Sequence, residues 1–563
     1  MKFTKYFMPF AALALLASCS NDNVDQPKDN PASKVGDKTY MNISVSMPNV
    51  TGSRAVEYDD GLAKEYALDN GYVYLFSTKT VSGNLVADQL VAKGELPVDD
   101  LRKAGTTDDI TGVINFYGIE VDNTAQDFGD HDGESVNYMA MIILNVNEDA
   151  ITEPGEGDDW SDWANGAQEK AMKYTDNGKE YFTMTNALGW SGAAASIATA
   201  PGMLVSVTED NLYHNDADKY LVTPVEFFVQ RGVAKVTINN STDGKIKVGD
   251  EATVTGRTSD KVTLSAWTLD ITNKSGFPVQ KIVDDQFTFI TDWTYNNLGA
   301  AQKRFVGTSH GTNNVQNTFN RVFWAVDPNY SSGSSANFNC LVGGAEDGTD
   351  LDPTQTTSGN DYPQYCLENT FDLDNMNKNV STRVVFKANY KANGQEGSFV
   401  CYGPNFYNVT SAYPVKVTKS GSYAVKDLFD QTDTEKYNAV LAELKATDNT
   451  KVDYYLNGDC YYTVIIRHFE ESECKDANDS FWDSWYFRGD YGVDETHYLG
   501  RYGMVRNNWY DVIINKISGP GEPTIPDPDE PEDPEPDDDP DPYKIDVTIN
   551  ILSWAKRSHS YDL

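Results

Sequence analysis

The sequence has 563 residues, a length that allows two or three domains. Its 45 basic and 85 acidic residues give a formal charge of −40, which argues against nucleic acid or an anionic membrane surface as a partner. The 33 tyrosines and 10 tryptophans, together with the scarcity of long helical patterns, favour an all-β protein.

The N-terminus has the features of a lipoprotein signal peptide. A basic start, Met1–Lys5, precedes an apolar run, Tyr6–Ala17, that is too short to span a bilayer as a helix. The run ends in Leu16-Ala-Ser-Cys19, where small residues precede a cysteine as in a bacterial lipobox. We therefore expect residues 1–18 to be removed and Cys19 to carry lipid, which would hold the chain on a membrane. The alternative is an ordinary signal peptide with an incidental cysteine.

Short alternating or apolar runs, separated by Gly, Asn, Asp and Pro, predict strands along the whole chain. In the first half they are Thr39–Met47, Gly71–Ser77, Gly112–Tyr117, Tyr138–Val146, Met203–Val207 and Val225–Val229. In the second half they are Ala234–Ile238, Lys261–Ile271, Arg383–Ala388, Tyr461–Ile466 and Trp509–Ile514. Strands at this spacing indicate antiparallel sandwiches, with a boundary near Val229–Lys235 that gives domains at 55–229 and 230–518. Helices are predicted only at Trp163–Tyr174 and Thr434–Ala446.

The first predicted strand precedes a loop that a protease could cut. Its apolar face consists of Met41, Ile43, Val45 and Met47, which alternate with polar residues. The loop that follows, Pro48–Ala55, is small and polar and contains Arg54, the first arginine of the chain. Exposed loops of small residues are the preferred sites of proteolysis, so the loop with Arg54 and Ala55 is a candidate cleavage site. The alternative is an ordinary exposed arginine.

The last 45 residues join an acidic linker to a further strand. The linker, residues 519–542, holds eleven acidic residues and no basic one, so the sequence predicts an extended, self-repelling chain. In the C-terminal segment, residues 543–563, the apolar positions are Ile545, Val547, Ile549, Ile551 and Trp554. The four aliphatic ones alternate with polar residues, as in a strand with one apolar face. Such a strand is either folded back onto its own domain or donated to another molecule.

Five stretches of the sequence resemble the Fim/Mfa fimbrillins, which build type V pili, and in particular an Mfa-type shaft subunit. They are the lipobox at Cys19, residues 230–238 (QRGVAKVTI), 460–468 (CYYTVIIRH) and 504–512 (MVRNNWYDV), and the acidic linker with its terminal strand. The resemblance implies two tandem β-sandwich domains of transthyretin-like, Greek-key topology. It also implies that an Arg-specific or trypsin-like protease removes residues 19–54, including the first strand, from the lipidated precursor.

The resemblance further implies donor-strand exchange, in which the C-terminal strand of a neighbouring subunit fills the groove that the first strand leaves. The product would be a surface fimbrium that supports adhesion and biofilm formation. The implied partners are other copies of the chain in a head-to-tail polymer, anchor and tip subunits, the protease, and receptors on host or bacterial surfaces. Contact with the outer membrane would depend only on the Cys19 lipid before processing, and no cofactor is implied.

Two other functions stay open on the sequence. A surface carbohydrate-binding lipoprotein would use the aromatic cluster Phe481–Phe487, with Trp482 and Trp485, although core packing explains such a cluster more simply. By the same resemblance, a tip subunit of the pilus would lack the donor strand, and an anchor subunit would keep its lipid and lack the processing arginine. This chain has both the strand and the arginine.

No pattern indicates an enzyme or a metal site. Gly307-Thr-Ser-His-Gly311 matches G-x-S-x-G, but no apolar helix follows it, so Ser309 and His310 are expected in a polar turn. The six histidines lack ligand spacing, and we expect His468 to make a local hydrogen bond. Asp372–Asn377 lacks the glycine and glutamate of a calcium loop. Disulfides among Cys340, Cys366, Cys401, Cys460 and Cys474 cannot be assigned from the sequence.

Overall fold

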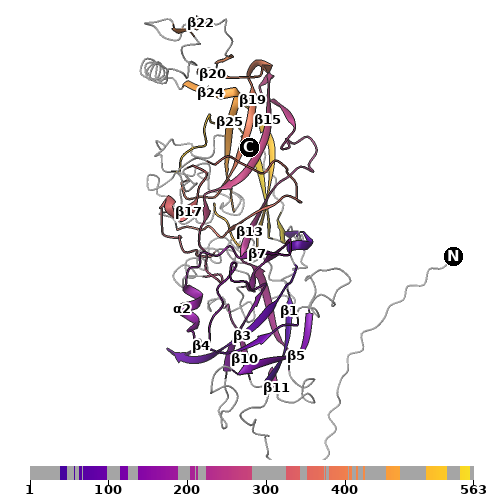
Figure 1. Ribbon diagram of the computed structural model, residues 1–563, viewed down its shortest axis with the longest axis vertical. Helices are drawn as coiled ribbons and strands as arrows, with labels where there is room; N and C mark the ends of the chain where they lie inside the picture. The colour runs from indigo at the N-terminus through magenta and orange to yellow at the C-terminus, as the bar shows by residue number, and fades with distance from the viewer. Residues whose placement is uncertain are drawn as a thin grey trace, which may run out of the picture.

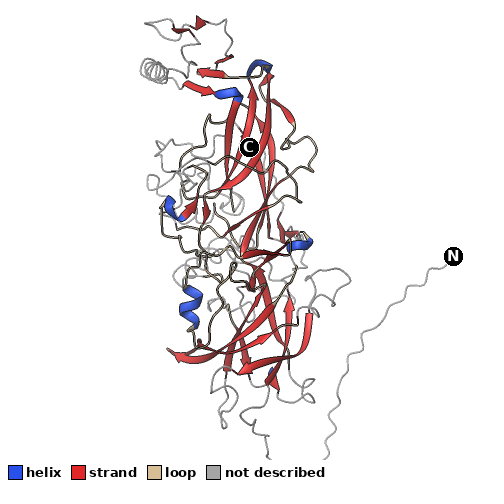
Figure 2. Cartoon of the chain, viewed as in Figure 1, coloured by secondary structure: helices blue, strands red, loops and turns tan. Residues whose placement is uncertain are grey.

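The structure is a computed structural model, and strands predominate in it, so the prediction of an all-β protein is confirmed (Figure 2). It describes residues 39–46, 56–57, 62–65, 67–97, 114–123, 137–187, 203–208, 211–213, 223–281, 325–342, 351–372, 375, 379–402, 405–408, 414–415, 423–424, 452–468, 502–528, 545–553 and 555–557. Each strand predicted above overlaps a strand of the structure.

Nine strands from the first half of the chain form the N-terminal sheet. They are β1 (Thr39–Ser46), β3 (Gly71–Val81), β4 (Asn84–Glu95), β5 (Ile114–Asn123), β6 (Asn137–Leu144), β9 (Met184–Asn186), β10 (Val205–Thr208), β11 (Leu212–Tyr213) and β12 (Val225–Arg231). Their order is β10-β6-β3-β4-β5-β1-β12-β9, and β11 pairs with β1. Because β6 also pairs with β9, the sheet closes on itself. Figure 1 shows these strands at the lower end of the molecule.

Apolar clusters cover both faces of this sheet. One cluster contains Val73 and Leu75 of β3 together with Phe227 of β12. The other contains Tyr74 and Phe76, from the alternate positions of β3, and it is covered by helix α2 (Trp160–Asn165). Because successive side chains of a strand point to opposite faces, burial on both faces explains why β3 has a continuous apolar run.

Helix α2 is much shorter than the helix predicted at Trp163–Tyr174. Asp159 caps its first turn by accepting hydrogen bonds from the backbone N–H groups of Ser161 and Asp162, and the helix ends at Gly166 in an extended conformation. Part of the remaining predicted segment is strand β7 (Lys173–Asp176), which pairs with β8 (Lys179–Phe182). The prediction was therefore wrong beyond Asn165. The predicted helix Thr434–Ala446 lies outside the described residues.

Two further sheets form the C-terminal sandwich. The first has the order β18-β13-β26-β27-β28-β2, and the second has the order β14-β15-β19-β25. The strands of the first are β2 (Val56–Glu57), β13 (Val233–Ile238), β18 (Gln364–Leu367), β26 (Trp509–Ile517), β27 (Ile545–Ser553) and β28 (Ala555–Arg557). Those of the second are β14 (Glu251–Val254), β15 (Arg257–Asp270), β19 (Arg383–Lys391) and β25 (Asp459–Ile465).

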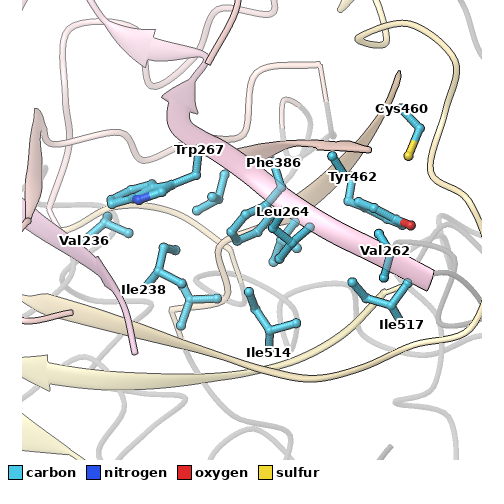
Figure 3. Packing of buried hydrophobic residues seen from close by; sticks show 14 of the residues in the cluster. Val236, Ile238, Val262, Leu264, Trp267, Phe386, Cys460, Tyr462, Ile514 and Ile517 are labelled. Atoms are coloured by element: carbon cyan, nitrogen blue, oxygen red, sulfur yellow. The ribbon is translucent and has the colours of Figure 1, made fainter. Parts of the chain in front are cut away.

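One apolar cluster lies between these two sheets (Figure 3). Ile238 of β13 and Ile514 of β26 contribute from the first sheet, and Leu264, Phe386 and Tyr462 contribute from the second. All five side chains are almost completely buried. Burial of a large apolar side chain contributes about 1.5–3 kcal/mol, so this cluster is a main source of stability for the sandwich.

The smaller elements of the described residues connect and extend these sheets. They are β16 (Thr272–Asn273), β17 (Phe338–Asn339), β20 (Phe399–Tyr402), β21 (Asn405–Asn408), β22 (Pro414–Val415), β23 (Tyr423–Ala424), β24 (Val452–Tyr455) and the 3-10 turns η1 (Ala63–Glu65), η4 (Ser335–Asn337), η5 (Ala392–Gly394) and η6 (Leu456–Gly458). In the part of the chain that is described, no helix has the length and apolar character needed to cross a membrane. The chain passes from the N-terminal sheet to the sandwich at Gly232, between β12 and β13.

Candidate functional site: the first and the last strands

Strand β1 lies in the interior of the N-terminal sheet, between β5 and β12. It is antiparallel to β5 and parallel to β12, so hydrogen-bonded neighbours flank it on both sides. The register places Ile43 opposite Phe116 of β5 and Val225 of β12. Backbone groups buried without a partner are costly, so the loss of β1 would leave two unpaired strand edges facing one gap.

The first strand also contributes side chains to the core. Met41 and Ile43, two of the four predicted apolar positions, are fully buried in the cluster that contains Phe227. The backbone of Val45 pairs with Ile114 and with Phe227. Met47 lies outside the described residues, as do Cys19, Arg54 and Ala55. The described part of β1 is therefore an interior strand of its sheet.

The C-terminal strand β27 is paired with β26 of the same chain. The predicted apolar positions Ile545, Val547, Ile549 and Ile551 lie opposite Ile517, Ile514, Val512 and Tyr510, in that order. These four residues of β26 are all fully buried in the sandwich core. Of the two positions that the sequence allowed for this strand, the single chain therefore adopts the folded-back one.

The end of the chain lies beside the residues that follow the expected cleavage site. Strand β28 is antiparallel to β27, with Ala555 opposite Ser553 and Lys556 opposite Leu552. Strand β28 then pairs with β2, where Val56 lies opposite Arg557. Trp554 itself is outside the described residues. The residues just after Ala55 and the last strands are thus neighbours in one sheet.

The first part of the predicted acidic linker, Gly519–Pro528, contacts the sandwich. Within Gly519–Pro528, Gly519, Pro520, Gly521 and Pro528 are buried, and Thr524 is the one exposed residue. The backbone of Glu522 pairs with Tyr461 of β25. The sequence predicted a self-repelling chain here, whereas Gly519, Gly521, Glu522 and Pro526 form hydrogen bonds with the sandwich.

A buried ionic cluster joins the N-terminal sheet to the sandwich. The carboxylate of Glu65, in η1, lies 2.8 Å from Lys235 Nζ, and both side chains are fully buried. Arg231 donates from Nε to the backbone carbonyl of Glu65, at 2.7 Å. Lys235 Nζ also lies 3.7 Å from the ring centre of Trp509. The two basic residues lie in the stretch QRGVAKVTI, residues 230–238. Because a buried charge needs a partner, a charged residue within an apolar strand indicates that an oppositely charged group is buried beside it.

Tyr365 completes this cluster from β18. Its hydroxyl donates to the Glu65 carboxylate at 2.5 Å. Burial, and then the negative charge of Glu65, raise the pKa of Tyr365 well above its ordinary value, so that the phenol stays a donor. The cluster holds one carboxylate and two cations with hydrogen-bonded partners, which suits a structural joint between the sheets.

The other residues considered from the sequence have structural environments where they are described. His468 is buried and its Nδ1 lies 2.7 Å from the hydroxyl of Tyr510, which is 42 residues away in the sequence, so its hydrogen bond is not the local one expected. The carboxylate of Asp372 accepts hydrogen bonds from the backbone and side chain of Asn375. Across the described ranges no group of three or more His, Cys, Asp and Glu residues could hold a metal ion.

The described cysteines form no disulfide with one another. They are Cys340, Cys366, Cys401 and Cys460. Burial raises the pKa of the Cys366 thiol to about 12, which keeps it protonated and unreactive at neutral pH. Cys474, Ser309, His310, Trp482 and Trp485 lie outside the described residues.

One region of the chain matches a family model of fimbrial proteins. Residues 453–560 match a family model described as the C-terminal region of fimbrillin, the major fimbrial subunit protein type IV. A search of curated sequences finds no match. Among solved structures, the chain is similar to one described as a cell adhesion protein from Parabacteroides distasonis, with 10% identity, a TM-score of 0.38, and coverage of 92% of this chain and 98% of that one.

A second similar structure is the tip fimbrial protein Mfa3 from Porphyromonas gingivalis with a C-terminal truncation, at 10% identity and a TM-score of 0.33, covering 91% of this chain and 100% of that one. A third, described as a cell adhesion protein from Bacteroides eggerthii, has 10% identity and a TM-score of 0.32, with 92% of this chain and 96% of that one covered. The family match includes β25, β26 and β27, three of the strands described above. Through its match over residues 453–560, the family model confirms the resemblance to Fim/Mfa-type fimbrillins that the sequence predicted.

Proposed function

We propose that this protein is a shaft subunit of surface fimbriae that polymerises by protease-activated donor-strand exchange. The single observation that carries the proposal is the position of β1 between β5 and β12, with Met41 and Ile43 fully buried. A strand in that position can be replaced by another strand, but its site cannot stay empty without cost. The fimbrillin match of residues 453–560 supports the role of pilus subunit.

The first step of the proposed assembly is the removal of β1. Cleavage after Arg54 would separate residues 19–54, and with them β1 and the lipid on Cys19, from the rest of the subunit. The vacated groove would expose the strand edges of β5 and β12 and the apolar side chains that Met41 and Ile43 cover. The loss of the buried contacts of Met41 and Ile43 costs about 1.5–3 kcal/mol for each side chain. The unpaired backbone groups of β5 and β12 add to this cost.

The second step is the entry of a neighbour's C-terminal strand. Strand β27 has 9 residues and β1 has 8, and both alternate apolar with polar positions. In the single chain β27 lies between β26 and β28, so its release breaks a long ladder with β26 and a short one with β28. Its insertion into the groove would form ladders with β5 and β12. We infer that insertion between β5 and β12 is favoured because it provides a long partner strand on each side of the donated strand, whereas in the single chain only β26 pairs with β27 over most of its length.

The reach of the donor segment is compatible with insertion into another subunit. Residues 529–544 separate the docked part of the linker from β27, and at about 3.1 Å per residue they span at most about 50 Å. Donor and acceptor are different surfaces of the subunit, so the contact is heterologous and generates an open filament. Anchor and tip subunits, surface receptors and biofilm formation enter this proposal as consequences of a fimbrial role.

The proposal is tested by deleting residues 543–563 in cells that produce the fimbriae. We expect a secreted, processed and protease-resistant subunit that forms no ladder of polymers on unboiled denaturing gels. Mixing it with full-length subunits should shorten filaments, because the truncated subunit accepts a strand and donates none. A truncated subunit that still forms long polymers would refute the proposal. An unfolded one would also refute it, because the sandwich would then need its own β27 to stay folded and could not release it to a neighbour.

A further inference from the structure

The first part of the acidic linker is attached to the sandwich by polar contacts along its length. The phenol of Tyr462 donates to the carbonyl of Gly519 at 2.7 Å, and the phenol of Tyr455 donates to the carbonyl of Gly521 at 2.8 Å. Both tyrosine side chains are almost fully buried. Burial raises the pKa of both phenols far above the ordinary value, so the two donors persist at any physiological pH.

Further contacts hold the segment at Glu522 and at Pro526. The backbones of Glu522 and Tyr461 exchange two hydrogen bonds of 2.7 and 2.8 Å. Arg383 donates from Nη2 to the carbonyl of Pro526 at 2.6 Å, and it also pairs with the buried carboxylate of Asp270. The contacts thus come from β19, β24 and β25, which are three separate strands.

The close approach of this segment to β25 depends on one glycine. A Cβ atom on Gly521 would lie 2.0 Å from the carbonyl oxygen of Tyr461, which is a backbone atom that cannot move aside easily. A Cβ atom on Gly519, two residues earlier, would meet nothing within 4 Å. The second glycine of Gly-Pro-Gly is therefore required by the contact, and the first is not.

We propose that Gly519–Pro526 is a docked strap that covers the edge of β25 and anchors the acidic arm, which is residues 529–542 of the linker. In a filament, tension on the donated strand would then act on the strap before it reaches β26. The part about tension rests on the proposed function. By strand pairing, β25 is the last strand of its sheet, and an uncovered edge is a template for unwanted pairing with another chain. The strap supplies a partner for that edge from the same chain.

The anchoring role follows from where the chain would otherwise be pulled. Without the strap, a force on the arm would act on Ile517, the last residue of β26, and would remove that strand from the core one hydrogen bond at a time. Ile517 and Ile514 are fully buried in the sandwich. With the strap in place, the backbone pair at Glu522 and the bonds from Tyr455, Tyr462 and Arg383 must break first.

The matched variants Gly521→Ala and Gly519→Ala test the strap in the full-length subunit. Hydrogen–deuterium exchange of unassembled protein reports on the amide of Glu522, which donates to Tyr461. We expect this amide to be protected in the wild type and in Gly519→Ala, and to exchange at least tenfold faster in Gly521→Ala. If Gly521→Ala does not fold, the double variant Tyr455→Phe/Tyr462→Phe keeps both rings, removes both donors and should give the same acceleration.

The role in filaments is tested by shearing polymers of the same variants. Polymers of Gly521→Ala should form and then break at lower shear than those of Gly519→Ala. The strap would be overturned if the Glu522 amide of the wild type exchanged as fast as the amides of residues 529–542. It would also be overturned if Gly519→Ala and Gly521→Ala had equal exchange rates and broke at the same shear. If the exchange results hold but wild-type polymers do not depend on residues 543–563, the strap is supported as an edge cover, and the proposed function and the role under tension both fail.

Discussion

Lys235 and Glu65 form a fully buried ion pair with an N–O distance of 2.8 Å, between the sandwich and the turn that follows β2. Replacing Lys235 with Met would leave the Glu65 carboxylate buried with one cationic partner fewer. We expect this to lower the free energy of unfolding by about 3–5 kcal/mol, as is typical when one partner of a buried pair is removed.

The control for this prediction is the adjacent pair of Lys64 and Glu180, in which the lysine side chain is 41% exposed. Lys64→Met should change the free energy of unfolding by less than about 1 kcal/mol. The double variant Lys235→Met/Glu65→Gln should regain part of the loss, because it removes both charges. Denaturant titration measures all three variants, and equal losses for Lys64→Met and Lys235→Met would contradict the importance of the buried pair.

Asp327 predicts a pH dependence of stability. Its carboxylate is buried and accepts hydrogen bonds from the backbone N–H groups of Asn329 and Thr370. Burial is the main cause that raises its pKa from 3.8 to about 7. Between these two pKa values the folded state keeps a proton on Asp327 that the unfolded state has lost. The contribution of Asp327 to stability therefore decreases as pH rises from about 4 to about 7 and is constant above that.

The measurement is the slope of the unfolding free energy against pH between 5 and 7, compared with that of Asp327→Asn. The variant cannot titrate at this position, so its stability should rise more, or fall less, over that interval than the stability of the wild type. Identical slopes for the two proteins would show that Asp327 is ionised in the folded state throughout, and the prediction would fail.

The strands could be predicted from the sequence wherever burial followed a period of two or a continuous apolar run. Strand β4 was missed, although it is longer than β6, because its pairing with β3 shifts register at Leu75/Phe76 and at Phe76/Thr78. Each bulge adds a residue to one strand and interrupts the alternation of apolar and polar positions. The pattern of Asn84–Glu95 therefore has no simple period, and only its partner strand defines it.

The candidate site was predictable in part for a similar reason. The alternation of β1 and β27 is a local property, and both strands exist as expected. Which strands flank β1 depends on residues far from it in the sequence. The buried pair of Glu65 and Lys235 joins residues 170 positions apart. The docking of Gly519–Pro526 was also missed, because composition alone does not show that tyrosine hydroxyl groups lie opposite the carbonyl groups of a proline-rich segment.

The protein is predicted to have no hydrolytic turnover. Replacing Ser309 or His310 with Ala should leave fimbrial assembly and adhesion unchanged, because the G-x-S-x-G match lacks the helix that a nucleophile elbow requires. Hydrolysis of ester and peptide substrates by purified protein is the measurement. A robust activity that Ser309→Ala abolishes would overturn the reading of this chain as a structural subunit.

The mature subunit is predicted to begin at Ala55. Residues 19–54 include β1, which must leave before another strand can occupy its position between β5 and β12. The intact mass of subunits from sheared filaments should match residues 55–563 without lipid. Arg54→Ala should instead accumulate as a lipidated precursor that does not polymerise. Lipidated Cys19 in the purified polymer would show that β1 is retained, contrary to the prediction.

The apolar face of β27 is predicted to decide whether the strand can be donated. In the register with β26, Ile549 lies opposite Val512, which is fully buried, and Thr548 lies opposite Ile513, which is half-buried. Directly opposed residues of antiparallel strands share a face of the sheet, so position 549 is on the core side and position 548 on the other side. Burying an unpaired carboxylate in the groove between β5 and β12 costs several kcal/mol. Ile549→Asp should therefore abolish the polymer ladder on unboiled gels. Thr548→Asp places the same charge on the opposite face and should be milder. Protease resistance of the monomer separates a donation defect from misfolding. Normal polymerisation of Ile549→Asp together with loss of polymers in Thr548→Asp would show that the face assignment is reversed.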